Sequence, residues 1–194
     1  MEKEELSPKE SLRIINEMIE NSKERFQDNG YIYLFWGWLV LVCALAQFIL
    51  LQLEYYEIHF YPYFLAIPGA IYTFIYEARR HKKSSKSSFL DKFFTALWIA
   101  TGINLFIVGF GFSFIFQVSP VPYILILIAI AVIVSGTVIN FKPLIVGGIV
   151  CNALAIASLF LSGIYHPIVV VLALIAAYLV PGYILRKQYK LQNV

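Results

Sequence analysis

The sequence predicts an all-α membrane protein, a six-transmembrane-helix bundle preceded by an N-terminal cytoplasmic amphipathic helix. Three observations predict this fold class. Charged residues make up only 14% of the 194 residues, against about 25% in a typical soluble domain, and the mean hydropathy is +0.74. The apolar residues form long runs without charge, each near the roughly 18 residues that cross a bilayer core. These runs are continuously apolar, whereas the strands of a membrane barrel alternate apolar and polar side chains.

Residues 1–30 are predicted to form the amphipathic helix on the cytoplasmic side. Ser7 and Glu10 have the spacing of a capping box, Pro8 takes the first helical position, and Gly30 follows as a stop signal. The segment carries five cations and eight carboxylates, a net charge of −3. Its apolar face could lie on the membrane surface, fold back on the chain's own basic loop, or contact a second copy or a cytoplasmic partner.

Residues 31–185 are predicted to form the six-helix transmembrane domain, and residues 186–194 a cytoplasmic tail. The six predicted spans are residues 31–53, 60–77, 93–116, 121–139, 144–161 and 167–185. The connections are short, so neighbours in sequence should be antiparallel neighbours in space. Pro68-Gly69 is expected to interrupt the second span. Gly147, Cys151 and Ala155 recur every four residues in the fifth span, which predicts a face on which other helices pack closely.

The basic residues predict how the chain is threaded. In a six-span arrangement, all 15 Lys and Arg residues fall on one side of the membrane, and the opposite side carries only Glu54 and Glu57. Basic residues near span ends are retained in the cytoplasm. The sequence therefore predicts a multi-pass protein of the bacterial cytoplasmic (inner) membrane, with both termini in the cytoplasm.

A cluster of five cations within eight positions follows the second predicted span. Its members are Arg79, Arg80, Lys82, Lys83 and Lys86. Nucleic-acid binding is not expected, because the cluster lacks interleaved aromatic side chains or a folded basic face. Juxtamembrane cations attract anionic headgroups, so membrane lipid is the expected contact, and the cluster could also contact a protein partner.

The predicted spans have no Asp, Glu, Lys, Arg or His near their middle. This pattern argues against a proton-coupled pump, an intramembrane protease or a haem protein, so no catalytic residue and no cofactor is expected. The uncharged polar features at mid-depth are Asn104, Asn152 and the Pro68-Gly69 pair. They predict a site for a small neutral solute, or, in the simpler interpretation, amides that bond neighbouring helices and a kinked span.

A metal site is a further possibility on the side opposite the basic residues. Glu54, Glu57 and His59 lie in one predicted loop and His166 in another. Two imidazoles and two carboxylates could hold Zn²⁺ in tetrahedral geometry if the two loops meet. The simpler interpretation is a pair of histidines at the membrane interface.

Three stretches, "DNGYIYLFWGWLV", "SGTVINFKPLIVGG" and "AAYLVPGYILRKQYK", together resemble an uncharacterised group of small bacterial six-span integral membrane proteins. The resemblance covers most of the chain and implies the six-span fold without an established activity. In architecture the chain also looks like the substrate-binding component of energy-coupling-factor vitamin transporters. Its first span has only Ala44 and Ala46, two residues apart, where a coupling face would have alanines four apart.

Two functions follow from these observations. The favoured one is a non-enzymatic regulatory or interaction protein that acts through its N-terminal helix and its basic loop, with a cytoplasmic protein or a second copy as partner. The alternative is binding or transport of a small neutral solute near Asn104, Asn152 and Pro68.

Overall fold

The computed structural model describes residues 30–83, 89–116 and 118–192. All regular structure in these ranges is helical, and they contain no strand. Four helical stretches are long and apolar enough to cross a membrane: Gly30–Gln52, Lys92–Ser113, Val121–Val138 and Gly163–Gln188. The all-helical class is thus confirmed, and the chain is compatible with a membrane protein. The predicted N-terminal helix lies outside the described residues.

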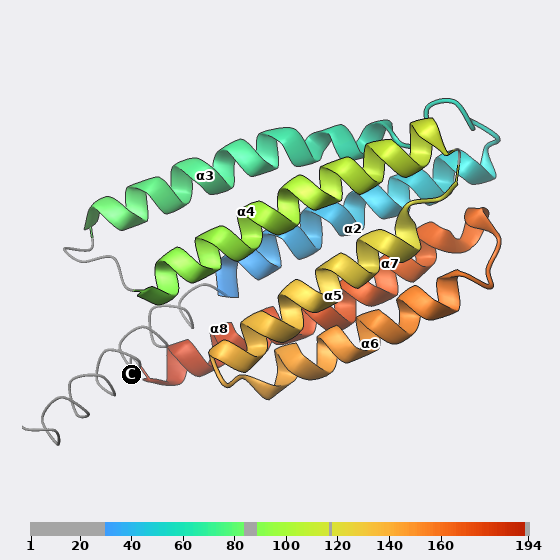
Figure 1. Ribbon diagram of the computed structural model, residues 1–194. Coiled ribbons are helices and arrows are strands. Elements are labelled where there is room, and N and C mark those ends of the chain that lie inside the picture. The colour runs from blue at the N-terminus through green and yellow to red at the C-terminus, as the bar shows by residue number, and fades with distance from the viewer. Residues whose placement is uncertain (1–29, 84–88, 117, 193–194) are drawn as a thin grey trace, which may run out of the picture.

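The helices run back and forth along one long axis of the molecule (Figure 1). In chain order they are α2 (Gly30–Gln52), the 3-10 helix η1 (Tyr61–Leu65), α3 (Ala66–Lys83), α4 (Phe89–Phe110), the π-helical turn η2 (Gly111–Ile115), α5 (Val121–Val138), α6 (Lys142–Ser158), the 3-10 turn η3 (Gly163–Tyr165), α7 (His166–Leu174), the π-helical segment η4 (Ile175–Leu179) and α8 (Val180–Gln192). The last three are continuous, and we call this long helix from His166 to Gln192 the rod.

Some helix boundaries in the structure differ from those of the predicted spans, because a helix can continue through polar residues beyond its apolar part. The apolar part of α3 gives way to a charged last turn, and α6 has 17 residues, so neither counts as a span by length and composition. The expected interruption at Pro68 is a change from 3-10 to α geometry at Ala66. Pro68 then lies in the first turn of α3, where a missing N–H costs little. The predicted tail from residue 186 is helical to Gln192.

The interior of the molecule lies between α2, α5, α6 and the rod. The contact between α5 and α6 is the most extensive one. Asn140 adopts a left-handed backbone conformation (φ 54°), which an asparagine tolerates and which allows the tight turn between these helices. A Cβ on Gly148 would lie 2.5 Å from Cγ1 of Ile133, so α5 and α6 approach as closely as a glycine permits. Gly147, Cys151 and Ala155 are buried, which confirms the predicted close-packed face.

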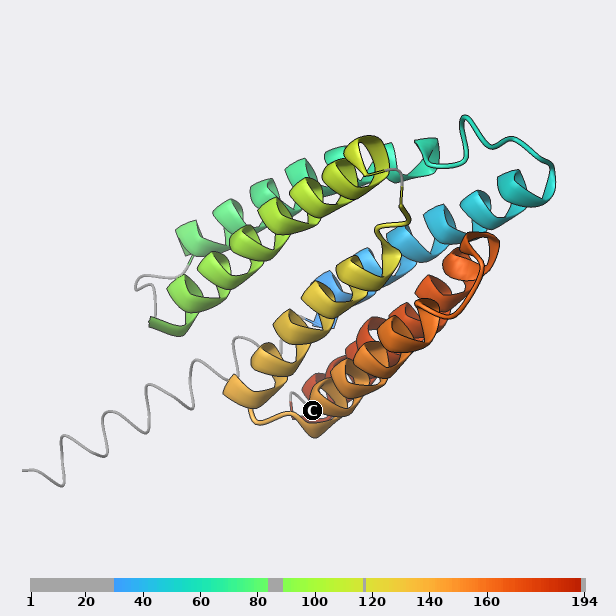
Figure 2. The ribbon, with the colours of Figure 1, turned by 45° about the vertical axis from the view of Figure 1, so that its right-hand side comes forward.

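The helices α3 and α4 form an outer layer. The main neighbour of α3 is α2, and that of α4 is α5. Both ribbon views place α3 and α4 together on one side of the other helices (Figures 1 and 2). Only 11% of the most apolar window of α4 is buried, against 56% for the rod. The outer layer is therefore held by far fewer contacts than the interior.

We expect Gly147→Ala to destabilise the protein by about 1–3 kcal/mol. The new Cβ would collide with the carbonyl oxygen of Ala176 and lie 2.9 Å from Cα of Ala177, and these backbone atoms cannot rotate away. Gly102→Ala, in the middle of α4, is the matched control because no atom lies within 4 Å of the added Cβ. Denaturant unfolding in detergent micelles measures both variants. Equal stability of the two would contradict the close approach of α6 to the rod.

Candidate functional site

The residues predicted to bind a solute lie on three different helices. Asn104 is exposed on α4, and its amide nitrogen donates a hydrogen bond to the Ala100 carbonyl in its own helix (2.8 Å). Asn152 is half-buried on α6, and Pro68 is exposed on α3. The helix α6 packs against α5 and the rod, whereas α3 packs against α2. The structure therefore does not bring the two asparagines to the Pro68-Gly69 pair.

The four residues of the predicted metal site have other surroundings. Glu54 and Glu57 are exposed in the loop after α2. His59 Nδ1 lies 2.9 Å from the side-chain nitrogen of Gln47, whose oxygen accepts a hydrogen bond from the Tyr63 hydroxyl (3.0 Å). Within the described ranges, no three His, Cys, Asp or Glu side chains come together in a way that could hold a metal ion.

His166 connects three segments at the same end of the molecule. Its Nδ1 lies 2.5 Å from the hydroxyl oxygen of Ser119, just before α5. Its Nε2 donates to the carbonyl of Ser158, at the end of α6 (2.9 Å). Both ring nitrogens of this buried side chain thus have partners within the protein. The histidine ties the start of the rod to its two neighbours.

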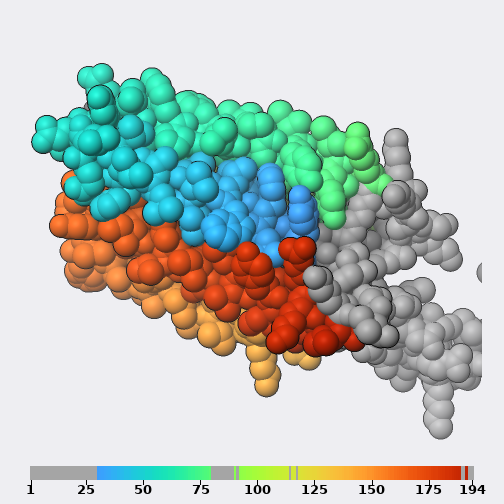
Figure 3. Space-filling model, turned by 180° about the vertical axis from the view of Figure 1, so that it is seen from behind, coloured from blue at the N-terminus to red at the C-terminus, as the bar shows by residue number. Residues whose placement is uncertain are grey.

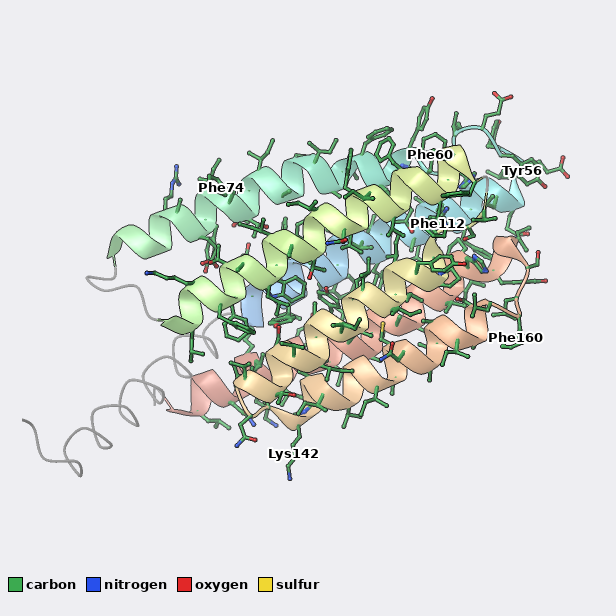
Figure 4. The ribbon with its side chains drawn as sticks, viewed as in Figure 1. Tyr56, Phe60, Phe74, Phe112, Lys142 and Phe160 are labelled. Atoms are coloured by element: carbon green, nitrogen blue, oxygen red, sulfur yellow. The ribbon has the colours of Figure 1, made fainter. Side chains whose placement is uncertain are left out.

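The predicted basic cluster begins in the last turns of α3. Arg79 is exposed there, whereas the side chains of Arg80, Lys82 and Lys83 and the whole of Lys86 lie outside the described part of the chain. The ends of α3 and α8 and the starts of α2 and α4 lie at one end of the molecule (Figure 1). Lys142, in the turn between α5 and α6, lies at this end, and Tyr56 and Phe160 lie at the opposite end (Figure 4).

A surface groove that the sequence did not predict runs along α2, between α3 and α8. Its volume is about 720 Å³. It is lined mostly by apolar and aromatic side chains, among them Tyr31, Phe35, Trp38, Tyr72 and Tyr183, with Arg186 at one end. Pro68 and Gly69 also line it. The α2 residues in the groove recur at intervals of three and four, so they form one face of that helix.

Two glycines allow the neighbouring helices to approach α2 closely on both sides of this groove. A Cβ on Gly69 would lie 2.9 Å from Cδ1 of Leu39, so α3 approaches α2 closely at that point. On the other side, a Cβ on Gly182 of α8 would lie 3.0 Å from Cγ of Leu34. Viewed from behind, α2 is exposed between α3 and the rod (Figure 3). The groove thus has α2 as its floor and the two neighbouring helices as its walls.

Two polar contacts hold the aromatic walls in place. The indole nitrogen of Trp38 donates to the hydroxyl of Tyr183 on α8 (3.2 Å). The hydroxyls of Tyr31 and Tyr72 lie 3.2 Å apart and join α2 to α3. Each of these amphipathic rings therefore has an apolar face available to the groove and a polar atom that is satisfied by another wall residue.

A second unpredicted feature is a polar spot within the interior. The rings of Tyr33, Trp98 and Tyr178 form a cluster, with centroids 5.8 to 6.4 Å apart. The hydroxyls of Tyr33 and Ser135 are buried near one another without hydrogen-bond geometry to any group. Tyr178 belongs to the π-helical segment η4, a geometry that is frequent at functional sites. The cluster can donate and accept hydrogen bonds through neutral groups.

Burial lowers the pKa of His59, so the folded state favours the neutral imidazole. Its contribution to stability is complete above the ordinary pKa of about 6.5 and is lost as the pH falls from there through the lowered pKa of the folded state. We expect the melting temperature to fall between pH 7.5 and pH 5, and to fall less in His59→Gln. Glu57→Gln, in the same loop but exposed, should keep the wild-type profile. An unchanged pH profile in His59→Gln would show that another group controls the loss.

Comparison with known proteins adds no functional assignment. No protein-family model, no curated protein and no solved structure matches this chain. The resemblance to small six-span proteins therefore stays a prediction. Function has to be inferred from the groove, the interior cluster and the distribution of charge, because a helical fold alone does not define an activity.

Proposed function

We propose that the protein is a non-enzymatic integral membrane protein of the bacterial cytoplasmic membrane, with a regulatory or interaction role at its basic cytoplasmic end. One observation carries this proposal: Arg79, Lys92, Lys142, Arg186 and Lys187 all belong to chain segments that meet at one end of the molecule. Cations near span ends are retained in the cytoplasm, so this end is the cytoplasmic one. Both termini of the described helices, Gly30 and Gln192, lie there.

Six spans fit this arrangement better than four. With 17 residues, α6 is about 26 Å long, close to the hydrocarbon thickness of about 30 Å, and it lies alongside α5 and the rod. The apolar part of α3 is extended at its start by the five residues of η1. At the end opposite the cations, each helix is joined to the next one by a short connection. A count of six also leaves every cation on the same side.

The outer layer favours an interaction role. The basic cluster joins α3 to α4, the two helices with the fewest contacts to the interior. A partner that binds the cluster can therefore shift these helices at a lower cost than it could shift the rod. The predicted amphipathic segment precedes α2 in the chain, and α2 starts at the same end, so we expect the segment and the basic cluster to act together on a cytoplasmic protein or a second copy.

A second candidate function, binding of a small ligand, is favoured by the groove on α2. The groove contains Pro68 and Gly69 but neither asparagine of the predicted solute site. Its apolar and aromatic lining suits an amphiphile better than a polar solute. Such a ligand would enter from the membrane, since several lining side chains, among them Trp38, Val42 and Tyr72, are about half exposed on a surface that would face lipid.

The orientation can be tested by cysteine labelling of intact cells. We expect a membrane-impermeant maleimide to label Glu57→Cys from outside and to label Lys83→Cys only after the membrane is opened. The physical reason is that the first position lies in the loop at the charge-poor end and the second in the basic cluster. Labelling of Lys83→Cys in intact cells would overturn the proposed orientation.

A second pair of positions controls for local accessibility. Lys142 begins α6 and Phe160 follows its last residue, so Lys142→Cys and Phe160→Cys should behave like the cytoplasmic and the external position, respectively. If α6 did not cross the membrane, both would be labelled from the same side. Cys43 and Cys151 are free and buried, and their replacement by alanine provides a background without competing thiols.

The interaction role predicts a specific dependence on the basic cluster. We expect Lys82→Gln combined with Lys83→Gln, or deletion of residues 2–27, to change the oligomeric state or the set of proteins crosslinked in native membranes. The control is Lys187→Gln combined with Lys190→Gln, which removes the same charge from the end of α8. Light scattering and crosslinking with mass spectrometry measure the outcome. No change in either measurement after both perturbations would contradict the proposal.

A further inference from the structure

The groove on α2 has the length of one membrane leaflet. It extends from Tyr31 to Val42, which are eleven residues apart, or about 16 Å along the helix. Leu65 of η1 lines it together with Val42. Half of a hydrocarbon core of about 30 Å is nearly the same length. A single acyl chain that enters at the Tyr31 end would therefore reach the bilayer midplane where the groove ends.

The chemistry of the groove changes along this length. Among the described residues that line the groove, Arg186 is the charged one and none carries a carboxylate. Tyr31 and Tyr183 also line the groove, and amphipathic rings of this kind favour the headgroup level. Toward the other end the lining becomes aliphatic, with Leu39, Val42 and Leu65. A cationic mouth and an apolar channel together match an anionic amphiphile.

We propose that this groove binds one acyl chain of an anionic phospholipid, with the Arg186 guanidinium on the phosphate. Guanidinium forms paired hydrogen bonds with phosphate oxygens, which an ammonium cannot do in the same fixed geometry. Trp38 and Tyr72 contact the chain from the floor and from the α3 wall. The lipid belongs to the leaflet on the cation-rich side. That this leaflet is the cytoplasmic one rests on the proposed orientation, and the binding itself does not.

The experiment is a titration of the full-length protein in detergent, followed by native mass spectrometry. The probes are palmitoyl-oleoyl phosphatidylglycerol and phosphatidylcholine with the same chains. We expect one phosphatidylglycerol to be retained at concentrations at least tenfold below those needed for phosphatidylcholine. Arg186→Gln should weaken phosphatidylglycerol retention at least tenfold, as expected for a hydrogen bond between two charged groups.

Lys187→Gln is the matched control for charge. It removes the same charge from the next position on α8 but does not line the groove. General attraction of one surface cation is worth a factor of about five, so its effect should not exceed this value. Equal losses in Arg186→Gln and Lys187→Gln, or equal retention of the two lipids by the wild type, would overturn the assignment of the phosphate to Arg186.

The apolar part of the groove is tested by filling it. Val42 is 54% exposed, so Val42→Trp should occupy the inner end of the groove without disturbing the interior, and should weaken retention of both lipids. Val146→Trp, at a position 58% exposed on α6, is the matched control and should bind like the wild type. Unchanged retention in Val42→Trp would place the lipid elsewhere and overturn the proposal, whatever the labelling experiments show about orientation.

Discussion

The structure depends on close backbone packing around the π-helical segment η4. On one side, Gly147 of α6 meets the carbonyl of Ala176. On the other, a Cβ on Gly37 of α2 would lie 2.8 Å from Cδ2 of Leu179. In a bilayer, apolar side chains gain little by moving from lipid to protein, so helices are held by close van der Waals contact, which small residues allow. The rod is thus packed closely between α6 and α2, an arrangement that we call the clamp. The helix α5 packs on α6, and the outer helices α3 and α4 pack on α2 and α5, respectively.

This clamp also explains the polar spot in the interior. Tyr178 lies in η4 between the two glycine contacts, and its ring meets those of Tyr33 and Trp98. A Cβ on Gly37 would lie 3.2 Å from Cβ of Tyr178, so α2 approaches the base of this side chain closely. The ring of Tyr178 lies beside Trp98 of α4, in the region around Phe94 that packs against the interior. This ring contact joins α4 to η4, in addition to the main contact of α4 with α5.

The sequence predicted those features that depend on local pattern. The four-residue spacing of Gly147, Cys151 and Ala155 was sufficient to identify a packed face, because small residues mark close approach regardless of the partner. Tyr31 and Tyr33 both begin the first predicted span, yet Tyr31 is 45% exposed and Tyr33 only 4%. A helix that is apolar all round has no contrast between faces, so its sequence does not show which side faces lipid. The sequence therefore predicts the depth of a residue along a span, but it predicts the rotation of the span about its axis only where small residues recur on one face, as in α6.

The asparagines and the groove show that the sequence also did not reveal which helices are neighbours. Asn104 and Asn152 were predicted at similar depth, but depth does not define which helices are neighbours, and α4 and α6 both pack on α5 rather than on each other. The groove forms because α2, α3 and α8 lie side by side, and no short sequence motif indicates that these helices are neighbours. Arg186 was predicted to follow the last span, so from the sequence it is only one more cytoplasmic cation.

The two proposed roles share a structural element, and this connects them. Tyr72 and Gly69 form a wall of the groove, and they belong to α3, the helix that leads into the basic cluster. Trp36 donates a hydrogen bond to Thr73 on this same helix (3.1 Å), one of the few polar contacts that hold α3 on α2. A ligand in the groove stabilises the position of α3 in which the groove fits it best. A partner on the basic cluster stabilises the position of α3 in which the cluster fits that partner best. If the two positions of α3 are the same, the groove ligand and the partner strengthen each other's binding. If the positions differ, each weakens the binding of the other, because coupling between two sites is reciprocal.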